Sequence, residues 1–259
     1  MKLRFASIID WNDSIYEGKI ASVVYLAGCP LRCPWCYSGA LVTAPSECSS
    51  EKPVEFFLNH LAKQRDKCNA VVFTGGEPCE QENALAELCA KLRGEGFAVK
   101  IETSGYYPEA LAGLIPNIDF VSLDIKTRLE QEDYAKACGF KGNAELLVSN
   151  VLRSIAFLET RGAQYGVEWE ARTTVVPQLN DDAQTIREIA RHAKNAGAYA
   201  LQALELDGRD LVDPAFAQNA SEPSREKMLE LAAAAKETLA ALGGNTNIIV
   251  RMKNAEAKI

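Results

Sequence analysis

Three cysteines stand close together in the stretch GCPLRCPWCYS, residues 28–38. Cys29, Cys33 and Cys36 follow the spacing C-x3-C-x2-C. Thiolates are soft ligands that suit zinc, copper(I) and iron–sulfur clusters, yet a closed structural zinc site takes four ligands. Three thiolates on a four-iron cluster leave one iron open to bind a substrate or cofactor. The spacing therefore indicates a metal centre with one open position.

Two other interpretations of the three cysteines remain open at this point. They could form a zinc knuckle with a distant fourth ligand, or a C-P-W-C redox pair with a spare cysteine. The remaining cysteines are scattered along the chain, at Cys48, Cys68, Cys79, Cys89 and Cys138. We expect these five to be buried free thiols, and we leave Cys79, which follows Pro78, out of the metal centre.

Polar motifs follow several apolar runs at the points where predicted strands end. They are TGGEP (residues 74–78), ETSG (102–105), LDIK (123–126) and RTTVVP (172–177). In α/β proteins ligands bind at the carboxyl ends of the strands, in the loops that follow. Their common position predicts that these motifs and the cysteine loop form one site.

The elements that must position these motifs alternate along the chain. The pattern predicts strands over residues 21–28, 70–76, 97–103, 120–125, 166–176, 198–204 and 246–252. It predicts helices over residues 54–66, 82–96, 108–115, 143–162, 183–197 and 224–244. Such alternation is typical of parallel strands joined by right-handed helical crossovers. It favours a doubly wound sheet or a full or partial α/β barrel.

Together these motifs resemble those of the radical S-adenosylmethionine (SAM) superfamily. Within it they are most similar to the glycyl-radical-enzyme activases, such as the activating protein of anaerobic ribonucleoside-triphosphate reductase. The resemblance covers about residues 20–205. It implies an α/β fold, a partial (β/α)6 TIM-like barrel of parallel strands with outer helices. We expect a single domain over residues 1–259, which the helix and strand of residues 224–252 complete.

The resemblance also implies a cofactor set and a role for each motif. Cys29, Cys33 and Cys36 would bind one [4Fe–4S] cluster, whose fourth iron takes the amino and carboxylate groups of SAM. The expected SAM-binding residues are Trp35, Gly75, Gly76, Glu77, Thr103, Ser104, Asp124, Lys126 and Arg172. Trp35 would form a wall for the adenine by stacking. The structural alternatives are a strand-to-helix turn for the glycines, a surface ion pair for Asp124 and Lys126, and salt bridges from Arg172 to Glu168 or Glu170.

The function that this resemblance implies is that of a radical SAM oxidoreductase. Reductive cleavage of SAM would give a 5′-deoxyadenosyl radical, which abstracts a hydrogen atom from a glycyl radical enzyme such as anaerobic ribonucleotide reductase. The expected electron donor is a low-potential flavodoxin or ferredoxin. One alternative is a small-molecule enzyme similar to 7-carboxy-7-deazaguanine synthase, and another is a non-catalytic iron–sulfur or zinc protein. Tyr37 and Ser38, after the third cysteine, match neither enzyme class.

Composition and charge limit the partners and the location. The net charge of −7, without a basic patch, argues against nucleic acid as a partner. No run of 18 apolar residues spans a membrane, and Asp10 interrupts the N-terminal apolar segment before a signal sequence develops. We therefore expect a cytoplasmic protein with reduced thiols.

Overall fold

The computed structural model of the chain, which describes residues 1–43, 45–206, 211–253 and 255–259, is built on one ten-stranded sheet. The strands are β1 (Lys2–Asn12), β2 (Ala21–Leu26), β3 (Ser50–Pro53), β4 (Ala70–Gly75), β5 (Ala98–Thr103), β6 (Phe120–Asp124), β7 (Glu168–Val175), β8 (Ala198–Ala203), β9 (Asn247–Met252) and β10 (Ala255–Lys258). Their order in the sheet is β10-β9-β8-β7-β6-β5-β4-β2-β1-β3.

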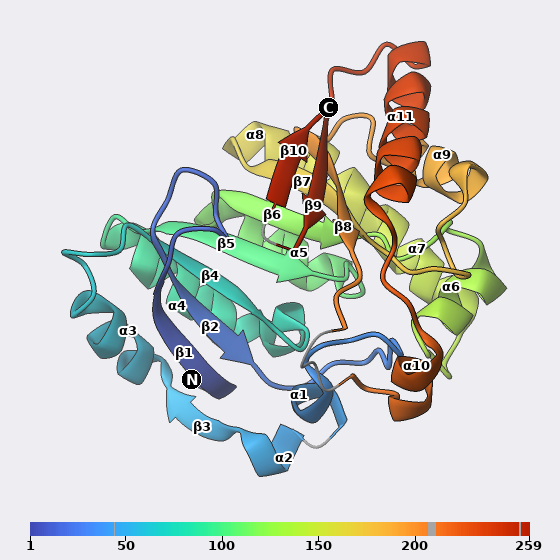
Figure 1. Cartoon of the computed structure of the whole chain (residues 1–259). Helices are drawn as coiled ribbons and strands as arrows, with labels where there is room; N and C mark the ends of the chain where they lie inside the picture. The colour runs from blue at the N-terminus through green and yellow to red at the C-terminus, as the bar shows by residue number, and fades with distance from the viewer. Residues whose placement is uncertain (44, 207–210, 254) are drawn as a thin grey trace.

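The strands from β2 to β9 in this order pair in parallel. β1 and β3 extend the sheet at one edge in antiparallel pairing, and β10 extends it at the other. This confirms the predicted fold class, an α/β fold with a mostly parallel curved sheet and outer helices (Figure 1). The three antiparallel strands were not predicted.

The helices lie mainly in the crossovers between the parallel strands. They are α1 (Gly39–Thr43), α2 (Pro45–Cys48), α3 (Val54–Ala62), α4 (Glu82–Gly94), α5 (Pro108–Leu114), α6 (Gln131–Ala137), α7 (Ala144–Phe157), α8 (Ala163–Tyr165), α9 (Ala183–His192), α10 (Pro214–Asn219) and α11 (Arg225–Ala241). Two short 3-10 helices, η1 (Pro78–Gln81) and η2 (Ile115–Asn117), and a π-helical turn, η3 (Leu158–Gly162), complete them.

Three of the longer helices have a capping side chain at their N-terminus. The side chains of Asn143, Asp182 and Ser224 each accept a hydrogen bond from the backbone N–H three residues later, at the starts of α7, α9 and α11. Such caps satisfy backbone donors that a helix leaves free at its N-terminus. The main hydrophobic core packs these helices against the sheet.

The inner face of the curved sheet carries a small hydrophobic cluster and, beside it, a group of charged and polar side chains. Strand alternation turns Glu102, Ser122 and Glu170, which are neighbours in register across β5, β6 and β7, to the same side. Within the described residues, every buried side-chain nitrogen or oxygen atom has a hydrogen-bond partner. The sheet can therefore keep charged side chains at its centre because each of them is paired.

The segment between β1 and β2 contacts the C-terminal strand. Lys258 of β10 forms an ion pair of 2.7 Å with Glu17, in the turn between β1 and β2. Across the part of the chain that the structure describes, no helix is both long and apolar enough to cross a membrane.

Candidate active site

A cavity of about 280 Å³ opens at the carboxyl ends of six neighbouring strands, from β2 to β8. All twelve residues that the sequence analysis selected line it: Cys29, Cys33, Trp35, Cys36, Gly75, Gly76, Glu77, Thr103, Ser104, Asp124, Lys126 and Arg172. Residues far apart in the sequence thus reach one site because parallel strands bring their carboxyl ends to the same edge. Their contacts with cofactors stay predictions.

The three cysteines occupy the loop between β2 and α1 as free thiols. Cys33 is buried, whereas Cys29 and Cys36 are partly exposed. Burial raises the pKa of the Cys29 and Cys36 thiols, and a hydrogen bond with Cys138 together with burial raises that of Cys33. Because metals bind thiolates, metal binding here has to displace protons.

The three cysteines are the candidate ligands of a metal centre. Among the described residues, no three side chains of the types His, Cys, Asp and Glu are grouped around one metal position. A [4Fe–4S] cluster takes its thiolates on different irons, so three sulfurs around a common cavity suit it without converging on one point. Cys29, Cys33 and Cys36 are thus the residues that could hold such a cluster.

The glycine motif packs the second strand end against the beginning of the cysteine loop. The N–H of Gly76 donates to the carbonyl of Leu26 over 2.8 Å, and the N–H of Glu77 donates to that of Gly28 over 2.7 Å. A Cβ atom on Gly76 would lie 2.0 Å from the Gly28 oxygen, a distance that no side chain tolerates. Gly76 is therefore required for the close approach of two backbones.

Glu77 holds the end of β5 next to this turn. One carboxylate oxygen accepts from the Thr103 hydroxyl at 2.7 Å, and the other accepts from the Ser104 N–H and hydroxyl at 2.8 and 2.6 Å. Glu77 also caps η1 by accepting from the N–H of Cys79. Glu77, Thr103 and Ser104, three of the predicted SAM-binding residues, line the cavity, and the hydrogen bonds from Thr103 and Ser104 to Glu77 set the shape of its wall.

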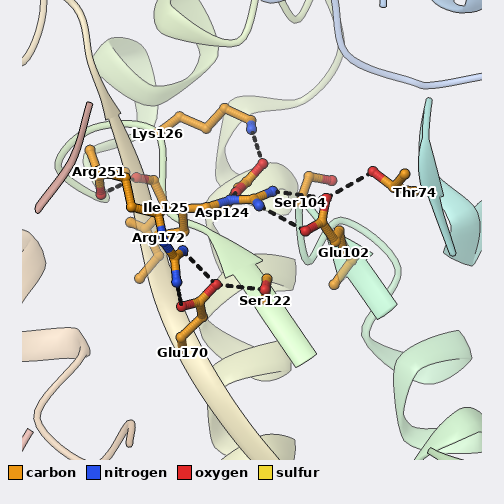
Figure 2. Close-up of polar contacts among 12 residues, drawn as sticks. Thr74, Glu102, Ser104, Ser122, Asp124, Ile125, Lys126, Glu170, Arg172 and Arg251 are labelled. Atoms are coloured by element: carbon orange, nitrogen blue, oxygen red, sulfur yellow. Dashed lines mark hydrogen bonds and ion pairs between the residues drawn. The ribbon is translucent and has the colours of Figure 1, made fainter. Parts of the chain in front are cut away.

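A network of five side chains forms the charged part of the cavity (Figure 2). Arg172 donates to Asp124 over 2.6 Å and to Glu102 over 2.9 Å. Lys126 binds the other oxygen of Asp124 at 2.9 Å, and the Thr74 hydroxyl donates to Glu102 at 2.9 Å. The network joins four strand ends and presents two cations and two carboxylates at the same place.

The ion pairs keep these groups charged although they are largely buried. Burial opposes the ionisation of Asp124 and Glu102, but the neighbouring cations outweigh it and lower the pKa of both carboxyls. Burial likewise opposes the charge on Arg172 and Lys126, and the carboxylates outweigh it and raise the pKa of both.

The structure corrects the alternative partners expected for Arg172. Neither Glu168 nor Glu170 pairs with it; Glu170 instead binds Arg251 through two contacts of 3.0 and 2.9 Å. The reason is sheet geometry. Residues two apart on one strand point the same way without meeting, whereas Asp124 lies directly opposite Arg172 in the register of β6 and β7.

Residues that follow β8 in the sequence contact the cysteine loop. The N–H of Glu205 donates to the Tyr37 hydroxyl over 2.6 Å, and the N–H groups of Val212 and Asp213 donate to the carbonyls of Cys36 and Pro34. The buried Trp35 ring lies 6.4 Å from that of Phe216, in α10. The structure thus gives Tyr37 a contact that its sequence position did not suggest.

Glu102 is the main site residue that sequence analysis missed. It precedes Thr103 at the end of β5, and the available signal was two charged residues, Lys100 and Glu102, on the same face of a strand. Cys79 is buried and does not line the cavity, in agreement with its exclusion from the metal centre. His60 lies on α3 and contacts Asp10, and it does not line the cavity.

The model of the Radical SAM superfamily matches residues 23–197. A protein of Methanocaldococcus jannaschii, provisionally named a glycyl-radical enzyme activating enzyme, is 28% identical over 261 residues and covers 100% of both chains. The 7-carboxy-7-deazaguanine synthase of the same organism is 25% identical over 245 residues, covering 88% of this chain and 89% of the relative.

A solved structure shares the fold. QueE from Escherichia coli superposes with a TM-score of 0.58 at 19% identity, over 97% of this chain and 94% of that one.

Proposed function

The chain belongs to the radical SAM superfamily, and on this premise we propose that it activates a glycyl radical enzyme. Family membership makes the chain an enzyme that uses a [4Fe–4S] cluster and SAM. The alternative of a non-catalytic iron–sulfur or zinc protein therefore does not hold. The proposed reaction removes a hydrogen atom from a backbone glycine of a partner protein.

The cofactors supply the radical chemistry and the chain supplies the site. When held by these residues, the cluster and SAM would supply a one-electron reductive cleavage of SAM to methionine and a 5′-deoxyadenosyl radical. Cys29, Cys33 and Cys36 are proposed to hold the cluster. A low-potential flavodoxin or ferredoxin is the proposed electron donor.

The charged network suits the amino-acid end of SAM, which carries an ammonium and a carboxylate group. Arg172 and Lys126 can bind the carboxylate, and Glu102 and Asp124 can bind the ammonium. Because the four side chains already hold one another in place, little reorganisation is needed on binding. The same rigidity would keep the reactive carbon of SAM in one position.

Apolar side chains form another part of the cavity wall. Leu31, Trp35 and Val42 are buried and line it beside the cysteines. Such a wall excludes water, which protects a carbon radical from side reactions. In the proposed enzyme these residues would surround the adenosine part of SAM.

The observation that most supports an activase is similarity over the whole length. The relative provisionally named a glycyl-radical enzyme activating enzyme aligns with this chain from end to end. The pyruvate formate-lyase-activating enzyme of Clostridium pasteurianum is also similar, at 26% identity over 68% of this chain.

The test is the formation of the glycyl radical itself. The anaerobically reconstituted, reduced enzyme is mixed with SAM and each candidate glycyl radical enzyme of its genome, and the sample is measured by electron paramagnetic resonance. We expect the glycyl doublet with one partner, none with Cys33→Ala, and an unchanged signal with the control Cys89→Ala. Formation of 5′-deoxyadenosine without a doublet from any partner would overturn the activase proposal while leaving the radical chemistry intact.

The second relative supports a small-molecule alternative. The 7-carboxy-7-deazaguanine synthase aligns with 88% of this chain, nearly as much as the activase relative does. Synthesis of 7-carboxy-7-deazaguanine is therefore the next candidate reaction. The reduced enzyme would then convert a compound in the low-molecular-weight fraction of a cell extract into 7-carboxy-7-deazaguanine, detected by mass spectrometry.

A further inference from the structure

A second and larger cavity lies at the opposite end of the sheet from the candidate active site. Its volume is about 1010 Å³. It opens at the amino ends of the strands β6 to β9, whose first residues, Phe120, Glu168, Ala198 and Asn247, line it. None of its lining residues also lines the first cavity. It is therefore separate from the site proposed for the cluster and SAM.

The cavity lies between an aromatic wall and a strand with a small side chain. Residues 13–18, between β1 and β2, form part of the lining, and the Tyr16 ring packs on that of Phe120 with centroids 5.5 Å apart. Ala198, opposite Glu170 in the register of β7 and β8, contributes only a methyl group. In a closed barrel this space is filled by layers of side chains, whereas here part of it is left open.

The charges around the cavity do not balance. Its lining contains the cations Lys100, Arg251 and Lys258 and the carboxylates Asp13, Glu17, Glu159, Glu168, Glu170 and Glu256. All three cations have carboxylate partners: Lys100 pairs with Glu102, Arg251 with Glu170 and Glu256, and Lys258 with Glu17. Within the part of the chain that the structure describes, no cation or hydrogen-bond donor contacts the Glu168 carboxylate. The cavity therefore has an excess of negative charge.

The hydroxyl of Tyr16 is a second polar group that lacks a partner among the described residues, although Tyr16 is only 9% exposed. Every fully buried side-chain oxygen of these residues has a partner, so this hydroxyl reaches open space, and the cavity is the space that Tyr16 lines. Burial, together with the carboxylates of Asp119 and Glu168, raises the pKa of Tyr16 to about 12 and keeps the hydroxyl protonated. Because polar groups in such positions are normally paired, the hydroxyl indicates an unfilled position for a ligand atom.

We propose that this cavity binds a small organic cation, with its ammonium group between the Glu168 carboxylate and the Tyr16 hydroxyl and its apolar part against the Phe120 ring. Glu168 lies directly opposite Phe120 in the register of β6 and β7, and the Tyr16 ring packs on the same Phe120 ring. Phe120 thus brings the two oxygen-bearing side chains together. An ammonium group has three N–H donors and can donate to both oxygens. The inference goes beyond the proposed function and uses no residue of the first cavity.

The test compares a cation with a neutral molecule of the same shape. The probes are phenethylammonium and phenethyl alcohol, which differ only in the ammonium and hydroxyl groups. Their binding to the full-length reconstituted enzyme is measured by isothermal titration calorimetry with saturating SAM, which occupies the first cavity. We expect the cation to bind about fivefold more tightly than the alcohol, because an ion pair at a partly exposed site contributes a factor of this order.

Two substitutions locate the binding site. Glu168→Gln should weaken binding of the cation about fivefold and Tyr16→Phe about threefold, and neither should change binding of the alcohol by more than about twofold. Both should fold, because Glu168 is exposed and phenylalanine keeps the ring of Tyr16. The control Glu145→Gln, at an exposed position on α7, should bind both probes as the wild type does. The inference is overturned if the wild type does not bind the cation, if both probes bind equally, or if neither substitution weakens binding of the cation.

Discussion

At the scale of single residues, the site depends on a few carboxylates that contact several partners. Glu102 accepts from Arg172 and Thr74 and lies 3.4 Å from the ammonium of Lys100. Its side chain is only 10% exposed, so its charge is maintained by these neighbours and not by water. Removing Arg172 would leave the Lys100 ammonium as the remaining cation beside this buried carboxylate.

The low pKa of Glu102 predicts a dependence of stability on acid pH. The unfolded chain binds a proton at this position near pH 4.3, whereas the folded protein binds it only at lower pH. Its contribution to stability is therefore complete above about pH 4.3 and is lost as pH falls through the lowered pKa. In Glu102→Gln, the slope of unfolding free energy against pH below 4.3 should decrease by up to about 1.4 kcal/mol per pH unit.

Urea unfolding of the cluster-free protein between pH 6 and pH 3 measures this slope. The control is Glu145→Gln, at an exposed position on α7. Equal slopes for wild type and Glu102→Gln would mean that the carboxyl is not held ionised by its neighbours.

At the scale of elements, turns and strand ends define the site more than the helices do. The turn after β4 packs on the end of β2 through Gly76, and the end of β5 is held by Glu77. The loop after β8 donates hydrogen bonds to the cysteine loop. Each of these contacts fixes the position of one segment relative to the next.

Gly76→Ala tests whether the two backbones need this close approach. The added Cβ atom would force the turn away from Gly28, and we expect a loss of about 1–3 kcal/mol in the free energy of unfolding. The cysteine loop should shift as well, so that less iron is retained per chain after reconstitution. Gly94→Ala is the matched control, because a Cβ atom on Gly94 meets nothing within 4 Å.

Iron content and chemical unfolding provide the two readouts. Gly94→Ala should stay within about 0.5 kcal/mol of the wild type. If Gly76→Ala behaves in the same way as this control, the glycine is not needed for packing.

At the scale of the whole molecule, one continuous sheet carries every segment of the site. The lining residues run from Tyr25 to Gln202 and lie at the ends of six strands or in the segments that follow them. The single domain expected from the sequence is a proposal that this arrangement supports. A ligand bound at the strand ends should stabilise all of these strands together.

Calorimetry tests this cooperativity. We expect one unfolding transition for the reconstituted enzyme, because the site-forming strands share one sheet and one main core. SAM at 100 times its dissociation constant adds about 2.7 kcal/mol, which for a chain of this size should raise Tm by about 5–10 °C. Two transitions, only one of which SAM shifts, would contradict a single domain.

The sequence by itself determined the class of fold and the positions of the expected site residues. Hydrophobic periodicity located the parallel strands, because a strand buried on a sheet needs an apolar run of limited length. It did not locate β1, β3 or β10, because short or half-exposed antiparallel strands lack that signal. Local motifs were sufficient to select all twelve predicted residues that line the cavity.

Only the tertiary structure decided which side chains meet. The partners of Arg172 and the place of Glu102 in the network join residues far apart in the chain. Sheet register brings them together, and register is not encoded in local spacing. The sequence therefore determined which chemical groups are available, whereas the fold decided how they are paired.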